Sequence, residues 1–173
     1  MKKEVKVEQE VMEPQVSEPQ ELLPRHGFVT FWLWLSIVFS AIVAIFMIVG
    51  LADGKVVREN AYDMAINSET ISYNAALNHV TVIIVMMLIL VLVHIFARFL
   101  LLGGKKLGFK IEVFAPIAFT IYMIIHQLIL GASIKGIIFF AVFYAVGFGV
   151  AIAVLYAILN IRKNGVPYWS QLK

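Results

Sequence analysis

Hydrophobic residues fill four long stretches of this chain, and polar residues are concentrated in the segments between them. The stretches cover residues 28–51, 78–102, 113–132 and 136–160. A helix that crosses the apolar core of a bilayer needs about 20 mostly apolar residues, and each stretch reaches that length. None shows the polar stripe of an amphipathic helix, so each needs protein or lipid on every side. The pattern predicts an all-α membrane protein with four transmembrane helices in an antiparallel bundle.

The segment 1–24 differs sharply from the rest of the chain. It contains six Glu, three Lys and three Pro but few large apolar residues, so it cannot bury enough surface to offset the entropy of ordering. We therefore expect a disordered acidic tail at 1–24 and one four-helix domain at 25–173. The tail is not typical of a signal peptide, because the apolar run after it is longer than the usual 7–15 residues or so.

Features between the apolar stretches predict their boundaries. In the external loop 52–77, Asp53-Gly54 favours a turn, Val57 and Ala61 favour a short interfacial helix, and Ser72 is a candidate cap for the next helix. The glycines at 103, 104 and 108 are expected to separate the second and third helices, and 131–133 to form the last turn. We place Pro116 in the first turn of the third helix. Tyr168, beside Trp169, is expected to anchor the chain at the membrane interface.

The distribution of basic residues predicts the orientation. Eleven of the 14 lysines and arginines belong to the N-terminal tail, the second loop, the C-terminal tail or the adjacent Arg98. Basic residues remain on the cytoplasmic side, so both termini should be cytoplasmic. The same distribution accounts for the basic charge through membrane topology, and we expect no nucleic-acid partner.

Polar residues within the apolar stretches are the candidate functional residues, because they are costly in a membrane. His94, Arg98, His126 and Gln127 are the main candidates. The preferred interpretation is structural: Arg98 reaches the interface or pairs with Glu112, and His126 and Gln127 form hydrogen bonds between helices. His94 and His126 differ in expected height by about 8 Å, which disfavours a haem held by both.

Several classes of chemistry lack their residues in this sequence. Cysteine is absent, the four stretches contain no carboxylate, and the nearest, Glu112, lies at a boundary. Metalloprotease, nucleotide-binding and serine-hydrolase motifs do not occur. We therefore expect no catalytic, cofactor-binding or metal-binding residues, and no enzymatic activity.

Small residues recur every four positions in the last stretch and form a stripe along one helix face. The stripe consists of Ala141, Ala145, Gly149, Ala153 and Ala157. Stripes of this kind let helix backbones approach closely in lipid. We interpret it as a packing seam that serves either the fold or a homo-oligomer.

Three segments carry a family resemblance: RHGFVTFWLWL at 25–35, KKLGF at 105–109 and IRKNGVPYWSQL at 161–172. They resemble small, functionally uncharacterised bacterial four-helix integral membrane proteins. In that group an aromatic residue often precedes the Lys-Lys pair, where this chain has Gly103-Gly104. The resemblance implies a multi-pass protein of the bacterial cytoplasmic (inner) membrane and no particular reaction.

These observations favour a structural, accessory or regulatory membrane component that acts through helix and loop contacts. Its expected partners are the lipid bilayer and a second copy or another membrane protein. The alternative is a channel or transporter subunit whose polar path involves His94, Arg98, His126 and Gln127. A carrier should gather these residues at one cavity, whereas an accessory protein should disperse them.

Overall fold

The computed structural model describes residues 26–67, 71–130 and 134–173. Four long helices are apolar enough to span a membrane: α1 (Gly27–Asp53), α3 (Tyr73–Leu102), α4 (Lys106–Ile129) and α5 (Ile134–Leu159). A shorter helix, α2 (Lys55–Ile66), connects α1 to α3, and a hairpin of β1 (Arg162–Lys163) and β2 (Val166–Pro167) leads into α6 (Tyr168–Gln171). The predicted all-α, multi-pass membrane fold is confirmed. The calls on segments 1–24 and 131–133 lie outside the described residues.

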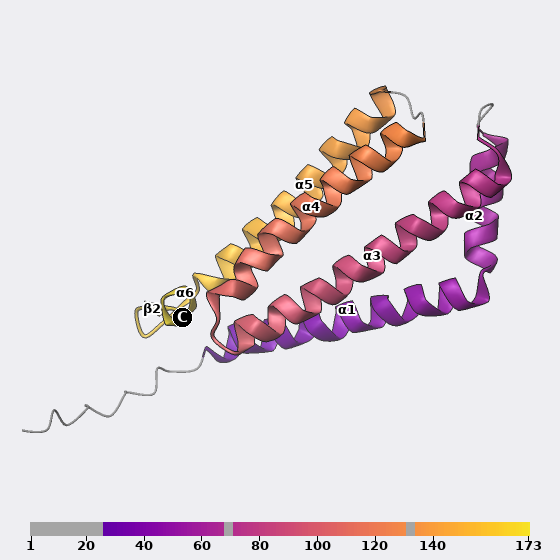
Figure 1. Ribbon diagram of the computed structural model, residues 1–173. Helices are drawn as coiled ribbons and strands as arrows, with labels where there is room; N and C mark the ends of the chain where they lie inside the picture. The colour runs from indigo at the N-terminus through magenta and orange to yellow at the C-terminus, as the bar shows by residue number, and fades with distance from the viewer. Residues whose placement is uncertain (1–25, 68–70, 131–133) are drawn as a thin grey trace, which may run out of the picture.

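The long helices alternate in direction and define two ends of the bundle (Figure 1). At the terminal end lie the start of α1, the α3–α4 connection and the C-terminal hairpin, whereas α2 marks the opposite end, the α2 end. Helix α3 packs against both α1 and α4, and α5 packs on α4. Helices α1 and α5 approach each other closely at few residues, so the bundle is open between them.

Helix α4 begins earlier than the apolar stretch predicted. It starts at Lys106 rather than at 113, which places Glu112 and Pro116 well inside the helix. The expectations of a boundary carboxylate and of a proline in the first turn are therefore wrong. Charged residues such as Lys110 interrupt the apolar stretch, so the sequence pattern placed the start of the helix too late. These residues are nevertheless part of α4.

Gly108 lies at the contact between α3 and α4. It does not separate the two helices, contrary to the sequence expectation. It is buried inside α4, and an added Cβ would lie 2.3 Å from the carbonyl oxygen of Ala97 on α3. A side chain of any size would push the two helices apart. The glycine thus fixes a close backbone contact between α3 and α4 near the terminal end.

The connection between α1 and α3 follows the sequence expectation. Gly54 has a φ of 66° and turns the chain between α1 and α2, and Val57 and Ala61 are the buried residues of α2. The Ser72 side chain accepts a hydrogen bond from the backbone N–H of Ala75 at 3.3 Å. The predicted short helix and the predicted cap are confirmed.

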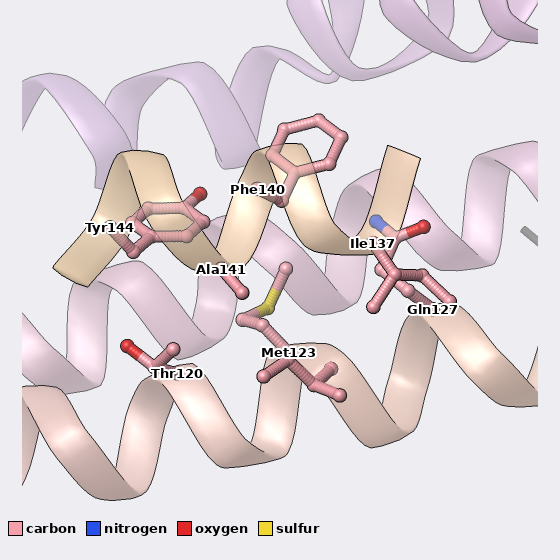
Figure 2. Close-up of a pocket in the computed structure, with 8 residues that line it drawn as sticks. Thr120, Met123, Gln127, Ile137, Phe140, Ala141 and Tyr144 are labelled. Carbon is pink, nitrogen blue, oxygen red and sulfur yellow. The ribbon is translucent and has the colours of Figure 1, made fainter. Parts of the chain in front are cut away.

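Helices α4 and α5 lie side by side, and side chains of both line a small pocket between them (Figure 2). The rings of Phe119 and Tyr144 meet edge to face at 5.7 Å, and Phe119 and Phe148 do so at 6.3 Å. Met123 also belongs to this buried cluster. The two helices are antiparallel neighbours, as the short connection between them predicted.

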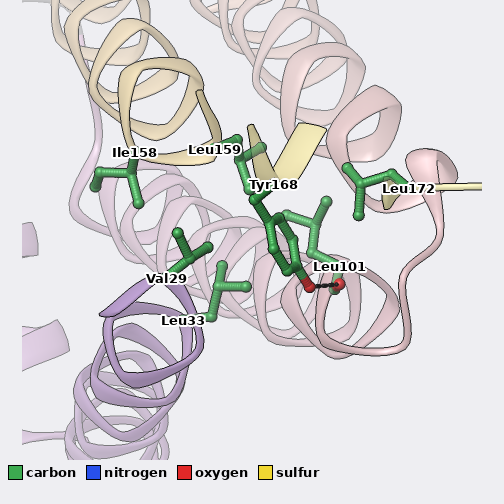
Figure 3. Packing of buried hydrophobic residues seen from close by; sticks show 7 residues of the cluster. All are labelled: Val29, Leu33, Leu101, Ile158, Leu159, Tyr168 and Leu172. Atoms are coloured by element: carbon green, nitrogen blue, oxygen red, sulfur yellow. Dashed lines mark hydrogen bonds between the residues drawn. The ribbon is translucent and has the colours of Figure 1, made fainter. Parts of the chain in front are cut away.

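The C-terminal segment closes the terminal end of the bundle (Figure 3). Tyr168 is buried among residues of α1, α3 and α5, and its hydroxyl donates a hydrogen bond to the carbonyl of Leu101 at 2.8 Å. The backbone of Lys173 bonds to Gly104 and Lys106 in the α3–α4 region. Tyr168 therefore fills the core instead of lying at the surface as an interfacial anchor. Burial also raises the pKa of its phenol above the ordinary value near 10.

Candidate functional site: two polar clusters

A buried carboxylate organises the polar residues near the terminal end. Glu112 on α4 is only 4% exposed. One of its oxygens, Oε2, contacts Nδ1 of His94, and the other, Oε1, lies 3.1 Å from Nε of Arg98. Both partners belong to α3, where their spacing of four residues places them on one helix face. The expected pairing of Arg98 with Glu112 is confirmed.

Arg98 extends this network to α1. Its Nη1 donates to the backbone carbonyl of Ser36 at 2.9 Å and to the hydroxyl of Ser40 at 2.7 Å. One guanidinium thus links α1, α3 and α4. The positive charge of Arg98 and the negative charge of Glu112 cancel, which reduces the cost of placing either group at membrane depth.

One acceptor position of this network remains open. The contact between Arg98 Nε and Glu112 Oε1 is an ion pair without hydrogen-bond geometry, and among the described residues the buried Oε1 has no hydrogen-bond donor. A buried acceptor without a donor costs about 1–3 kcal/mol. The charges of Arg98 and Glu112 therefore balance, whereas one buried oxygen of Glu112 has no hydrogen-bond donor among the described residues.

A cavity of about 350 Å³ lies beside these residues. All four spanning helices contribute to it: Ser36 from α1, Arg98 from α3, Glu112 from α4 and Ile152 from α5 are among the lining residues. Most of the lining is apolar. Its polar atoms are concentrated where α1, α3 and α4 meet.

The cavity is close to the terminal end of the bundle. Glu112 lies six residues after the start of α4, or about 9 Å along the helix axis, and Arg98 lies four residues before the end of α3, or about 6 Å. Both side chains therefore lie within about two turns of the end of their helix.

A second polar cluster lies near the α2 end. Nδ1 of His79 on α3 and Nε2 of His126 on α4 are 2.9 Å apart, and Nε2 of His79 lies 3.4 Å from the side-chain nitrogen of Gln127. The ring of Tyr122 stacks on His126 with its centroid 5.8 Å away. The predicted interhelical hydrogen bonding of His126 is confirmed, although its partner His79 was not among the candidates.

An apolar layer separates the two clusters. Glu112 and His126 are 14 residues apart on α4, or about 21 Å. Between them the buried side chains of Leu90, Phe119 and Met123 fill the contact between helices. The small cavity in the α4–α5 contact shown in Figure 2 holds only about 10 Å³, close to the minimum for one water molecule. The four sequence candidates are therefore divided, with His94 and Arg98 in one cluster and His126 and Gln127 in the other.

Most of the stripe of small residues on α5 is exposed, and two of its members line a groove between α4 and α5. Ala145, Gly149, Ala153 and Ala157 are exposed in the single chain, and only Ala141 is half-buried. Outside its own helix, an added Cβ at Gly149 would meet no atom of the described residues within 4 Å. Of the two roles that the sequence left open for the stripe, packing within the fold is therefore not seen at Gly149. Bulky side chains make the α4 contact instead, and a role of the stripe between copies stays a prediction.

Sequence reasoning missed three members of the clusters, Ser36, Ser40 and His79, and it placed Glu112 at a helix boundary instead of inside α4. Serines are common in apolar helices and carry no specific signal, and His79 sits at the edge of its apolar stretch. The interior position of Glu112 could have been predicted by starting the third helix at the Lys105-Lys106 pair. Comparisons with protein-family models, with curated proteins and with solved structures find no match to this chain.

Proposed function

We propose that this chain is a structural, accessory or regulatory component of a membrane, which acts through contacts of its helices and loops. The observation that carries the proposal is the separation of its intramembrane polar residues into two clusters. Each cluster joins neighbouring helices, and an apolar layer lies between them. Polar residues that tie helices together are an ordinary device of membrane proteins.

The same separation argues against the alternative of a channel or transporter subunit. A polar path through His94, Arg98, His126 and Gln127 would have to pass the buried apolar side chains that lie between the two clusters. We propose no catalytic role for either cluster.

We further propose that the protein resides in a bacterial cytoplasmic membrane with both termini cytoplasmic. The proposal rests on the bias of basic residues and on the family resemblance. The terminal end, with the Glu112 cavity, would then face the cytoplasm. Because the chain contains no cysteine, single-cysteine labelling of intact cells tests this directly. An impermeant thiol reagent should modify a cysteine at position 67 and spare one at 106, and the reverse pattern would contradict the orientation.

The contact role is tested with a photoreactive amino acid in native membranes. Phe143 on α5 is 64% exposed, whereas Phe119 on α4 is buried. Replacing each with benzoyl-phenylalanine makes a matched pair with the same ring chemistry. We expect a discrete protein crosslink, either to a second copy or to another membrane protein, from position 143 and none from 119.

A flux measurement on purified protein in liposomes provides the opposing test. The proposal predicts no protein-dependent flux of protons, potassium or sodium. Protein-dependent flux that is abolished by both His94→Ala and His126→Ala, at unchanged protein levels, would contradict it and favour a conduit.

A further inference from the structure

The cavity beside Glu112 has the size and lining of a ligand site. Its volume of about 350 Å³ falls within the range of about 300–1,000 Å³ that is common for small-molecule sites. Such sites combine mostly apolar walls with a few polar groups that orient the ligand. Here Ile152 and Leu155 of α5 belong to the apolar wall, and Arg98 and Glu112 supply the polar groups.

The position of the cavity favours a ligand that comes from the bilayer. Trp32 of α1 and Val154 of α5 both line it and remain 37% and 47% exposed. Since α1 and α5 approach each other at few residues, the space between them offers a lateral entrance at membrane depth. A molecule with a polar head and an apolar chain can place its head in the cavity and leave its chain among the lipids.

The charges of Arg98 and Glu112 restrict which headgroup the cavity can bind. Arg98 is already neutralised by Glu112 at 3.1 Å, so a phosphate or carboxylate would bring a second negative charge beside a buried carboxylate. Like charges that share a buried site are strongly disfavoured. An ammonium head would have to compete with Arg98 for the same carboxylate. A neutral head avoids both costs.

Hydrogen bonding narrows the choice to a hydroxyl group. Oε1 of Glu112 has no hydrogen-bond donor among the described residues, but it is itself buried, so a ligand reaches it only after the side chains around it shift. A ligand that then donates a hydrogen bond to Oε1 would remove an existing penalty. A hydroxyl group both donates and accepts, and a guanidinium has five N–H donors. The ligand hydroxyl can therefore donate to Glu112 while it accepts from Arg98.

We propose that this cavity binds the head of a neutral, hydroxyl-bearing lipid of the diacylglycerol type, which enters between α1 and α5. The proposal goes beyond the accessory role and is independent of it, because it concerns a lipid site that is measured on the purified protein without any protein partner.

The experiment uses photoreactive lipids in liposomes of phosphatidylcholine that contain the full-length protein. One probe is a diacylglycerol with a diazirine close to its head, and the matched probe is the phosphatidic acid with the same chains. We expect the diacylglycerol to label the protein at least tenfold more than the phosphatidic acid, with label on α5 within residues 148–155. Equal labelling by the two probes, or no labelling in this segment, would overturn the proposal.

Two substitutions on one helix separate the cavity from the general lipid surface. Both alanines are exposed, but Ala151 lines the cavity and Ala153 lines none of the cavities described above. Ala151→Leu should fill the space and lower diacylglycerol labelling about tenfold, and Ala153→Leu should leave it unchanged. If both variants label equally, the lipid does not bind in this cavity.

Substitution of the carboxylate tests the charge argument. Glu112→Gln keeps the shape of the side chain but leaves Arg98 without its counter-charge. We expect the ratio of diacylglycerol labelling to phosphatidic acid labelling to fall at least tenfold in this variant. An unchanged preference in a folded Glu112→Gln protein would overturn the argument for a neutral head, and the Ala151 pair tests the site even if this variant does not fold.

Discussion

The two ends of the bundle are held together by different means. At the terminal end, an ion pair joins α3 to α4, Arg98 reaches α1, Gly108 brings two backbones into contact, and Tyr168 fills the remaining space. At the α2 end, the principal polar contact between the described spanning helices is the pair of His79 and His126 with Gln127. The polar contacts at the terminal end therefore join three helices, whereas those at the α2 end join two.

This difference affects stability because lipid, and not water, surrounds the spanning helices. Lipid chains are as apolar as leucine, so burying apolar side chains between helices gives little hydrophobic driving force in a membrane. Close packing and specific polar contacts then decide which helices remain together. We expect changes at the terminal end to destabilise the protein more than changes at the α2 end.

The largest effect should follow from removing the buried carboxylate. Glu112→Ala leaves Arg98 without its counter-charge, and breaking a buried pair in this way costs about 3–5 kcal/mol. Unfolding of the purified protein in mild detergent measures the loss. Glu59→Ala is the control, because Glu59 and its partner Lys55 form an exposed pair on α2 at 3.8 Å and should contribute less than about 1 kcal/mol. Equal losses in the two variants would show that the buried network does not stabilise the bundle.

Two neighbouring residues of α5 test the packing between α4 and α5. Phe148→Leu removes an aromatic contact with Phe119 and should cost about 1–2 kcal/mol. Gly149→Leu adds a side chain where none of the described atoms lies within 4 Å of the new Cβ and should cost much less in the single chain. Thermal unfolding at high dilution compares them, and a larger loss in Gly149→Leu would contradict the packing.

The same pair of variants also reports on oligomers. If the small-residue stripe joins two copies, Gly149→Leu should reduce the size of the particle in mild detergent while Phe148→Leu does not. Light scattering of both proteins distinguishes these results. Unchanged size in both would remove the stripe as an interface between copies.

A smaller effect is expected at the C-terminal segment. Tyr168→Phe removes the hydrogen bond to Leu101 and should cost about 1 kcal/mol near neutral pH. Tyr62→Phe is the control, since Tyr62 is 60% exposed on α2. Comparable losses in the two variants would contradict the stabilising role of the hydrogen bond from Tyr168 to Leu101.

The same tyrosine should make stability depend on alkaline pH. Burial raises the pKa of Tyr168 in the folded protein, so the folded state retains the phenol proton longer than the unfolded state. This contribution is fully present below about pH 10 and is lost as the pH rises through the raised pKa. The advantage of the parent over Tyr168→Phe should therefore shrink above about pH 10. An advantage that grows with pH would contradict the assignment.

The smallest effect should come from the histidine pair at the α2 end. His126→Ala removes the contact with His79, and interhelical hydrogen bonds in membranes average about 0.6 kcal/mol. Unfolding in mild detergent should show a loss of this order. A loss as large as that of Glu112→Ala would remove the distinction between the two ends.

The hydrophobic pattern predicted the spanning helices well, because long apolar runs have few alternatives to helices in a membrane. It failed at the start of α4, where Lys106, Lys110 and Glu112 made a helical segment look like a loop. The same error turned Gly108 into a chain break, although it is a contact point. Helix length follows from composition, but the start of a helix at a charged interface does not.

The contacts between helices were predictable only in part. The pairing of Arg98 with Glu112 followed from their similar heights on adjacent helices. The His79–His126 contact and the links from Arg98 to Ser36 and Ser40 depend on how each helix is rotated about its axis. A helix that is apolar all round gives no periodic signal for that rotation, so the faces of α1 and α5 could not be assigned from the sequence.

The most direct test of the central claim is a double-mutant cycle on Arg98 and Glu112. The claim is that these residues act as one neutral unit that ties the terminal end. The single variants Arg98→Met and Glu112→Leu each remove one partner of the ion pair and should each lose about 3–5 kcal/mol. The double variant leaves no charge and should recover most of that loss, giving a coupling energy of several kcal/mol in the unfolding measurement. Additive losses, with no recovery in the double variant, would contradict the claim.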